Sequence, residues 1–84
     1  MLLENYPNPF NPSTTIRYGL PKRSYVTLTV FNTLGQLVAI LQRGEQEAGN
    51  YEVEFDGNGL SGGVYFYAIT AGNLTQMRKA ALVR

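Results

Sequence analysis

The sequence predicts an all-β protein, an antiparallel sandwich built from six clear strands and a short additional one at the start. Segments in which apolar and polar residues alternate recur along the chain at the spacing typical of sandwich strands. The 9 glycines and 4 prolines suit a chain with many turns, and no segment shows helical periodicity. An apolar fraction of 44% with a charged fraction of 15% fits a folded domain, and 84 residues allow only a small core.

The stretch Gly63–Thr70 is the predicted central strand. Aromatic and β-branched residues suit the pleated surface of a sheet, and here they occupy both faces. No charged residue occurs between Asp56 and Arg78, whereas an edge strand normally carries charge or proline. We therefore expect both faces to be partly covered. Val64, Phe66 and Ala68 lie on one face, and Tyr65, Tyr67 and Ile69 on the other.

The chain opens with a short pairing segment and a proline-rich lead-in. Leu2 and Leu3 are expected to pair at a sheet edge. Residues 5–13 contain three prolines and three asparagines, which predicts a rigid extended loop rather than a strand or a helix. Tyr6 and Phe10 are its expected anchors in the domain.

Alternation then predicts the remaining strands. The segment Gln36–Leu41 by itself also fits a short buried helix, but its length and its flanking Gly35 and Gly44 favour a strand. Residues 44–49 are expected to form an exposed loop. The other strands are Thr14–Leu20, Tyr25–Phe31, Asn50–Phe55 and Asn73–Val83. From their inward positions and those of the central strand, we expect a core that includes Tyr18, Leu28, Val30, Val53, Phe55, Phe66 and Ile69.

Several function classes lack the residues that they need. The chain has no cysteine and no histidine, which excludes thiolate metal sites, disulfides and Ser-His catalysis, and a single aspartate argues against a calcium site. A net charge of +1 is too small for a nucleic-acid footprint, and no apolar run approaches the length of a membrane span. We expect no enzyme activity, no cofactor and no metal.

Two motifs resemble sites but do not fit their context. Residues 57–62 match the dinucleotide-binding glycine pattern, yet a strand is predicted to follow them where the pyrophosphate needs a helix N-terminus. Glu52 and Glu54 share a strand face at a spacing that suits paired catalytic carboxylates. That face is predicted to be solvated, whereas a general acid needs burial to raise its pKa.

Four tyrosines leave a binding alternative open. Tyr18, Tyr25, Tyr65 and Tyr67 would form a sugar-stacking face if several were exposed on one sheet. Their positions in alternating strands favour core or cross-strand packing instead.

Five segments together resemble one family closely. They are Asn5–Pro12, Thr14–Ile16, Val30–Gly35, Gly63–Tyr67 and Arg78–Lys79. In this combination the chain resembles the type A C-terminal sorting domain of the type IX secretion system, over nearly its whole length. The resemblance implies an immunoglobulin-like β-sandwich of six to seven strands, with residues 1–84 forming one domain of a larger secreted protein. The family is similar also to the domain of flagellar hook-capping proteins.

The resemblance also implies partners and recognition positions. An outer-membrane translocon would read the domain and bring the N-terminally attached cargo to the cell surface or the extracellular space. A surface sorting peptidase would cut before Leu2 and join the cargo to lipopolysaccharide. The domain would act as a monomer. The positions matching recognition-linked segments are Gly63, Tyr65, Gly72, Arg78, Lys79 and Arg84, of which the three basic residues are expected to form a local positive cluster.

Three classes of function therefore compete. A sorting and anchoring signal accounts for the motifs. A carbohydrate-binding module appended to an extracellular enzyme needs a planar row of exposed aromatic side chains or a cleft. An inert spacer predicts that function does not depend on the last ten residues.

Overall fold

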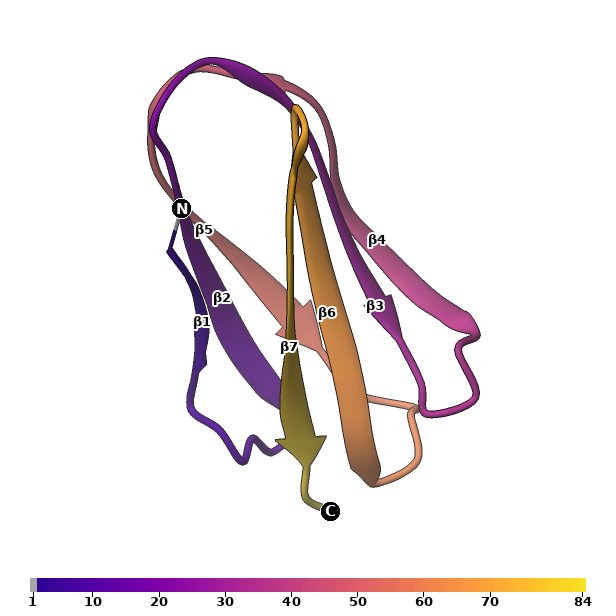
Figure 1. Ribbon diagram of the computed structural model, residues 1–84. Helices are drawn as coiled ribbons and strands as arrows, with labels where there is room; N and C mark the ends of the chain where they lie inside the picture. Colours follow the sequence, from indigo (N-terminus) through magenta and orange to yellow (C-terminus); the bar gives the residue numbers. More distant parts are fainter. Residues whose placement is uncertain (1) are drawn as a thin grey trace.

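The computed structural model describes residues 2–84 and shows an antiparallel β-sandwich of two sheets (Figure 1). The three-stranded sheet has the order β1-β2-β5 and the four-stranded sheet the order β4-β3-β6-β7, the arrangement of an immunoglobulin-like sandwich. Residues 2–84 contain no helix that is long and apolar enough to cross a membrane. The strands are β1 (Leu3–Tyr6), β2 (Ser13–Leu20), β3 (Ser24–Phe31), β4 (Leu37–Gln46), β5 (Gly49–Asp56), β6 (Gly63–Ala71) and β7 (Leu74–Leu82).

Strand β6 lies between β3 and β7, which confirms the predicted central strand. Its Tyr65, Tyr67 and Ile69 face the core and are almost fully buried. Phe66 occupies the opposite face and is only half-buried, so the prediction that it belongs to the core is wrong. The reason is that no segment among residues 2–84 covers the outer face of this sheet, and Val64 on the same face is 41% exposed.

The core lies between the two sheets and is closed by tyrosine hydroxyls that bond across it. Tyr18 of β2 donates to Gln46 Oε1 of β4 at 2.6 Å, and Tyr67 of β6 donates to Asn5 Oδ1 of β1 at 2.8 Å. Each bond joins one sheet to the other and satisfies a hydroxyl that burial would otherwise leave unpaired. The predicted core residues Tyr18, Leu28, Val30, Phe55 and Ile69 are buried, and Val53 is partly buried against them.

The start of the chain is more ordered than expected. Leu3 pairs with Tyr18 as part of β1, which extends as far as Tyr6 and so includes two residues predicted to belong to the loop. Phe10 is 1% exposed and packs on Phe55 with ring centroids 5.8 Å apart, which confirms it as an anchor. Tyr6 is 76% exposed, so its predicted anchoring role is wrong. Strand alternation explains this, because Leu3 and Asn5 take the inward positions of β1.

The predicted exposed loop over residues 44–49 is wrong for most of its length. Strand β4 continues through Gly44 to Gln46, because it stays paired with β3 as far as Ser24. Register shifts near Thr29 and Phe31 accommodate the length difference between the two strands.

Candidate functional site at the C-terminal strand

The hairpin that carries most of the candidate recognition residues is closed by Gly72. Ala71 pairs with Leu74, which leaves Gly72 and Asn73 as a two-residue turn. The φ of Gly72 is +61°, which suits the first central position of a type II′ turn and is disfavoured for any residue with a Cβ. Gly63, at φ +142°, begins β6 at the other end. The two glycines therefore set where the central strand starts and where it turns back.

Tyr65 is a buried anchor rather than a surface residue. It is 7% exposed, and its hydroxyl donates to the carbonyl oxygen of Ser61 at 2.6 Å. A tyrosine near the start of this strand that bonds to backbone a few residues upstream is the tyrosine corner of immunoglobulin-like sandwiches. Tyr65 thereby fixes the loop 57–62 against β6.

Arg84 holds the same loop from the other side. Its Nη1 donates to the carbonyl oxygen of Leu60 at 2.8 Å and to that of Gly57 at 3.3 Å. The backbone N–H of Gly57 in turn donates to the carbonyl oxygen of Pro12 at 2.7 Å. A Cβ on residue 57 would lie 2.8 Å from that oxygen, so the close approach of the two backbones requires glycine. The loop is therefore held between the lead-in and the end of β7.

The lead-in also pairs with the lower part of β7, the end nearest the C-terminus in Figure 1. Phe10 N–H donates to Ala81 O at 2.8 Å, and Val83 N–H donates to Phe10 O at 2.9 Å. The Asn8 amide acts like a further strand residue, accepting from Ala81 N–H at 3.1 Å and donating to Lys79 O at 3.3 Å. The lower edge of β7 is thus already occupied by the chain itself.

Above this contact, β7 is open. All residues from Gly72 to Lys79 are exposed. Ala81 presents both its N–H and its C=O to the lead-in, and alternate residues of an antiparallel strand present these groups to the same edge. The N–H and C=O of Thr75 and Met77, and the N–H of Lys79, therefore face the free edge.

The two basic residues of β7 point to opposite faces. Arg78 pairs with Tyr67 on the inner face, at the margin of the sandwich, and Lys79 pairs with Phe66 on the outer face. Burial raises the pKa of the Tyr67 hydroxyl, while the Arg78 guanidinium lowers it and the Glu4 carboxylate raises it. Within residues 2–84 neither Arg78 nor Lys79 forms an ion pair. The expected group of three cations is therefore divided among the two faces of β7 and the loop that Arg84 binds.

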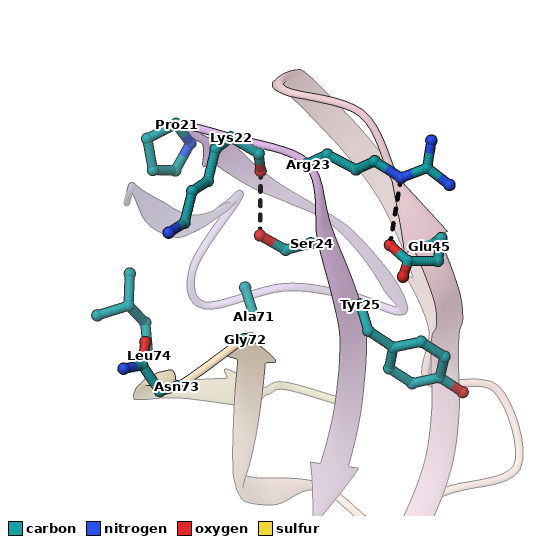
Figure 2. Close-up of a pocket in the computed structure, with 10 residues that line it drawn as sticks. All are labelled: Pro21, Lys22, Arg23, Ser24, Tyr25, Glu45, Ala71, Gly72, Asn73 and Leu74. Atoms are coloured by element: carbon teal, nitrogen blue, oxygen red, sulfur yellow. Dashed lines mark hydrogen bonds and ion pairs between the residues drawn. The ribbon is translucent and has the colours of Figure 1, made fainter.

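The opposite end of the hairpin carries a cavity of ≈ 350 Å³ (Figure 2). It is formed by residues 21–25, which comprise the connection from β2 and the start of β3, by the turn 71–74, and by Glu45. Ser24 Oγ donates to Lys22 O at 3.0 Å, and Arg23 Nε lies 3.6 Å from Glu45 Oε2. Two pairs of polar groups at its rim are thus bonded to each other.

The two motifs that resemble catalytic or nucleotide sites lie in other settings. Glu52 and Glu54 are exposed on β5, and Glu52 Oε2 lies 3.9 Å from Arg17 Nη1. Residues 57–62 form the loop described above and lead into strand β6 rather than into a helix. In the part of the chain that the structure describes, no three Asp, Glu, His or Cys side chains are grouped closely enough to hold a metal ion.

Sequence reasoning missed the contacts that join the ends of the chain. It identified Asn8, Phe10 and Arg84 as members of motifs, but each contacts a segment far away in the sequence. Tyr65 could have been recognised from the sequence, because a tyrosine near the start of a predicted central strand is the mark of a tyrosine corner.

These features define an immunoglobulin-like sandwich in which the edge strand β7 is partly covered by the lead-in and otherwise open. The family model for the secretion system C-terminal sorting domain matches residues 4–83, so the chain belongs to this family, the sorting signal domains of type IX secretion. Among solved structures, the chain is similar to PorZ, a bacterial surface component of the type IX secretion system of Porphyromonas gingivalis, with a TM-score of 0.68 and 24% identity. That likeness covers 98% of this chain but only 11% of PorZ, and it shows the fold. No curated protein sequence matches the chain.

Proposed function

We propose that the domain is a non-catalytic handle that an outer-membrane translocon recognises in order to bring an N-terminally attached cargo to the cell surface. Membership of the sorting-domain family supports this proposal. The observation that carries it is the exposed strand β7, whose residues from Leu74 to Lys79 lie open at the margin of a sandwich that is otherwise well anchored. A translocon that accepts unrelated cargoes needs such a common surface.

The candidate residues divide into two roles. Arg78 and Lys79 are exposed and have no ion pair within residues 2–84, so they are free to set the orientation of a partner through charge. Tyr65 and Arg84 bond to the loop 57–62 instead, and Gly63 and Gly72 define the ends of β6. These four residues act by keeping β7 in place.

The surface peptidase belongs to the same proposal. Cleavage before Leu2 would fall just ahead of the first residue of β1, whereas the proline-rich lead-in continues from the last residues of that strand. In this reading residues 1–84 are one domain of a longer protein, act as a monomer and leave the cell with the cargo.

No observation favours the carbohydrate-binding alternative. Tyr18, Tyr65 and Tyr67 are buried, and their hydroxyls bond within the domain. Tyr25 is 53% exposed on β3. The planar row of aromatic side chains that sugar stacking needs therefore has a single candidate among these four.

Export of a fluorescent reporter tests the proposal. The reporter is fused to the N-terminus of the domain and produced in a bacterium with a type IX system, and surface and periplasmic fluorescence are compared. We expect the intact domain to bring the reporter to the surface and a domain lacking residues 75–84 to leave it in the periplasm. Export of the deletion fusion at the level of the intact fusion would overturn the sorting role.

A charge variant separates recognition from folding. Arg78→Ala with Lys79→Ala removes two exposed charges from β7, and Lys22→Ala with Arg43→Ala removes two exposed charges elsewhere. We expect the first pair to lower surface fluorescence and the second to leave it unchanged, with both purified domains melting like the parent. Equal export of the two double variants would remove Arg78 and Lys79 from the recognition surface.

A further inference from the structure

We propose that the upper edge of β7, from Thr75 to Lys79, binds an extended segment of a partner protein as an added strand, with an acidic side chain of that segment next to Arg78 or Lys79. The inference rests on the proposed sorting function and specifies how the partner is held. Four observations lead to it.

The first is the set of unpaired backbone groups. Thr75 and Met77 each direct an N–H and a C=O to the free edge, and Lys79 directs its N–H there. No segment among residues 2–84 pairs with this part of β7. A row of free donors and acceptors in strand geometry is the template on which β-strand addition occurs.

The second is that the lead-in limits the length of the free edge. Asn8 already donates to Lys79 O, and both Asn8 and Phe10 bond to Ala81. An added strand can therefore run alongside β7 only as far as Lys79. At the other end the turn at Gly72 and Asn73 closes the hairpin. The site accepts a segment of about five residues at the rise of a β-strand.

The third is an apolar surface beside this edge. Met77 is 60% exposed on the outer face. It lines a cavity of ≈ 360 Å³ together with Phe31, Asn32, Thr33, Gly35 and Phe66. A side chain that an added strand places level with Met77 on the outer face would extend this surface. Edge hydrogen bonds supply affinity in strand addition, and such neighbouring side-chain pockets supply specificity.

The fourth is charge, which also decides between a partner and a second copy of this chain. No acidic residue follows Asp56 in the sequence. Antiparallel pairing of this edge with the same edge of another copy, centred on Met77, would place Gln76 opposite Arg78 and Thr75 opposite Lys79, so neither cation would gain a counter-charge. A segment that carries Asp or Glu would instead neutralise them.

Blocking the edge without disturbing the hairpin tests this inference. Met77→Pro removes an N–H that faces away from β6, the position at which an edge strand tolerates proline. The domain with Lys22→Ala and Arg43→Ala is the control, since both residues are exposed and lie outside β7. In the reporter assay we expect Met77→Pro to lower surface export about tenfold, the effect of losing a central hydrogen bond and its close contacts. The control should export like the parent.

A second variant keeps the test decisive if Met77→Pro melts at a lower temperature. Lys79→Glu leaves the backbone unchanged and reverses the charge next to the added strand, so it should also lower export. Normal export of both folded variants, with the intact domain exported and the 75–84 deletion retained, would overturn strand addition while leaving the sorting role in place. Failure of the intact domain to export would instead overturn the sorting role itself. Reduced export together with a concentration-dependent dimer of the parent domain in solution would point to a second copy and would also overturn the inference.

Discussion

The Nη1 of Arg84 donates a hydrogen bond of 2.8 Å to the backbone carbonyl oxygen of Leu60, which ties the end of the chain to the loop before the central strand. This contact gives Arg84 a part in stability that its sequence position does not reveal. Together with the bond to Gly57, whose carbonyl oxygen also accepts from the Leu60 N–H, it holds the loop 57–62 to a residue that follows β7.

We therefore expect Arg84→Ala to lower the free energy of unfolding by about 1 kcal/mol, the typical net value of such hydrogen bonds. Lys79→Ala is the control, because the Lys79 side chain is exposed and has no ion pair within residues 2–84. Urea denaturation followed by circular dichroism measures both. Identical midpoints for the two variants would show that the Arg84 contact contributes nothing.

The tyrosine corner gives a second prediction. Tyr65→Phe removes the hydroxyl that bonds to Ser61 O and should cost about 0.5 to 1.5 kcal/mol. Tyr51→Phe removes a bond of similar length to Glu47 O, at an exposed hairpin. Because water can replace the partner there, we expect a smaller loss in this control. A Tyr65→Phe domain as stable as the parent would contradict the structural role of the corner.

The two faces of the four-stranded sheet should respond differently to truncation. Leu28 is fully buried, and Leu28→Ala should destabilise the domain by roughly 2 to 5 kcal/mol. Phe66 is half-buried on the outer face, so Phe66→Ala should cost clearly less in spite of its larger side chain. Thermal melts of the two variants measure this difference. A melting temperature of Phe66→Ala below that of Leu28→Ala would mean that something covers the outer face in solution.

Stability should fall at alkaline pH. Burial raises the pKa values of Tyr18 and Tyr67 above the ordinary 10.0. The hydrogen bond to Gln46 lowers the pKa of Tyr18, and the charge of Arg78 lowers that of Tyr67, but burial is the larger effect in both. The unfolded chain therefore loses these protons first. The stabilisation is fully present below about pH 10 and is lost as pH rises through the folded pKa values.

Urea midpoints measured across this range test the alkaline effect. The decline should be shallower for Tyr18→Phe than for the parent. Leu34→Ala alters an exposed side chain that does not titrate and should leave the decline unchanged. A parent domain whose midpoint stays constant from pH 9 to well above pH 10 would contradict the assigned cause.

Much of the fold could be predicted because its signals are local. The alternation of Val26, Leu28 and Val30 and the two apolar faces of Gly63–Thr70 each need only neighbouring residues to be interpreted. Which of the two faces of β6 meets the other sheet was not determined locally, since Phe66 and Tyr67 are both aromatic. The choice depends on how the second sheet packs.

The site was less accessible to sequence reasoning for the same reason. Arg78 and Lys79 could be named as recognition positions from the family resemblance. The partners of Asn8, Phe10 and Arg84 lie far away in the sequence, and no periodicity encodes such contacts. Lys79 and Arg84, both named as recognition positions, consequently have different surroundings in the folded domain.

The bridge between Phe10 and Leu82 has a mechanical consequence. The two segments run parallel, and bonds from Phe10 reach Ala81 and Val83. If a cargo pulls on the N-terminal side of Phe10 while the C-terminal end of β7 is held, the tension acts along the two parallel segments in opposite directions. The bonds are then sheared together instead of being opened one after another. The domain should therefore resist force along this axis more strongly than force that peels β7 away from β6, a difference that single-molecule pulling from the two attachment geometries would measure.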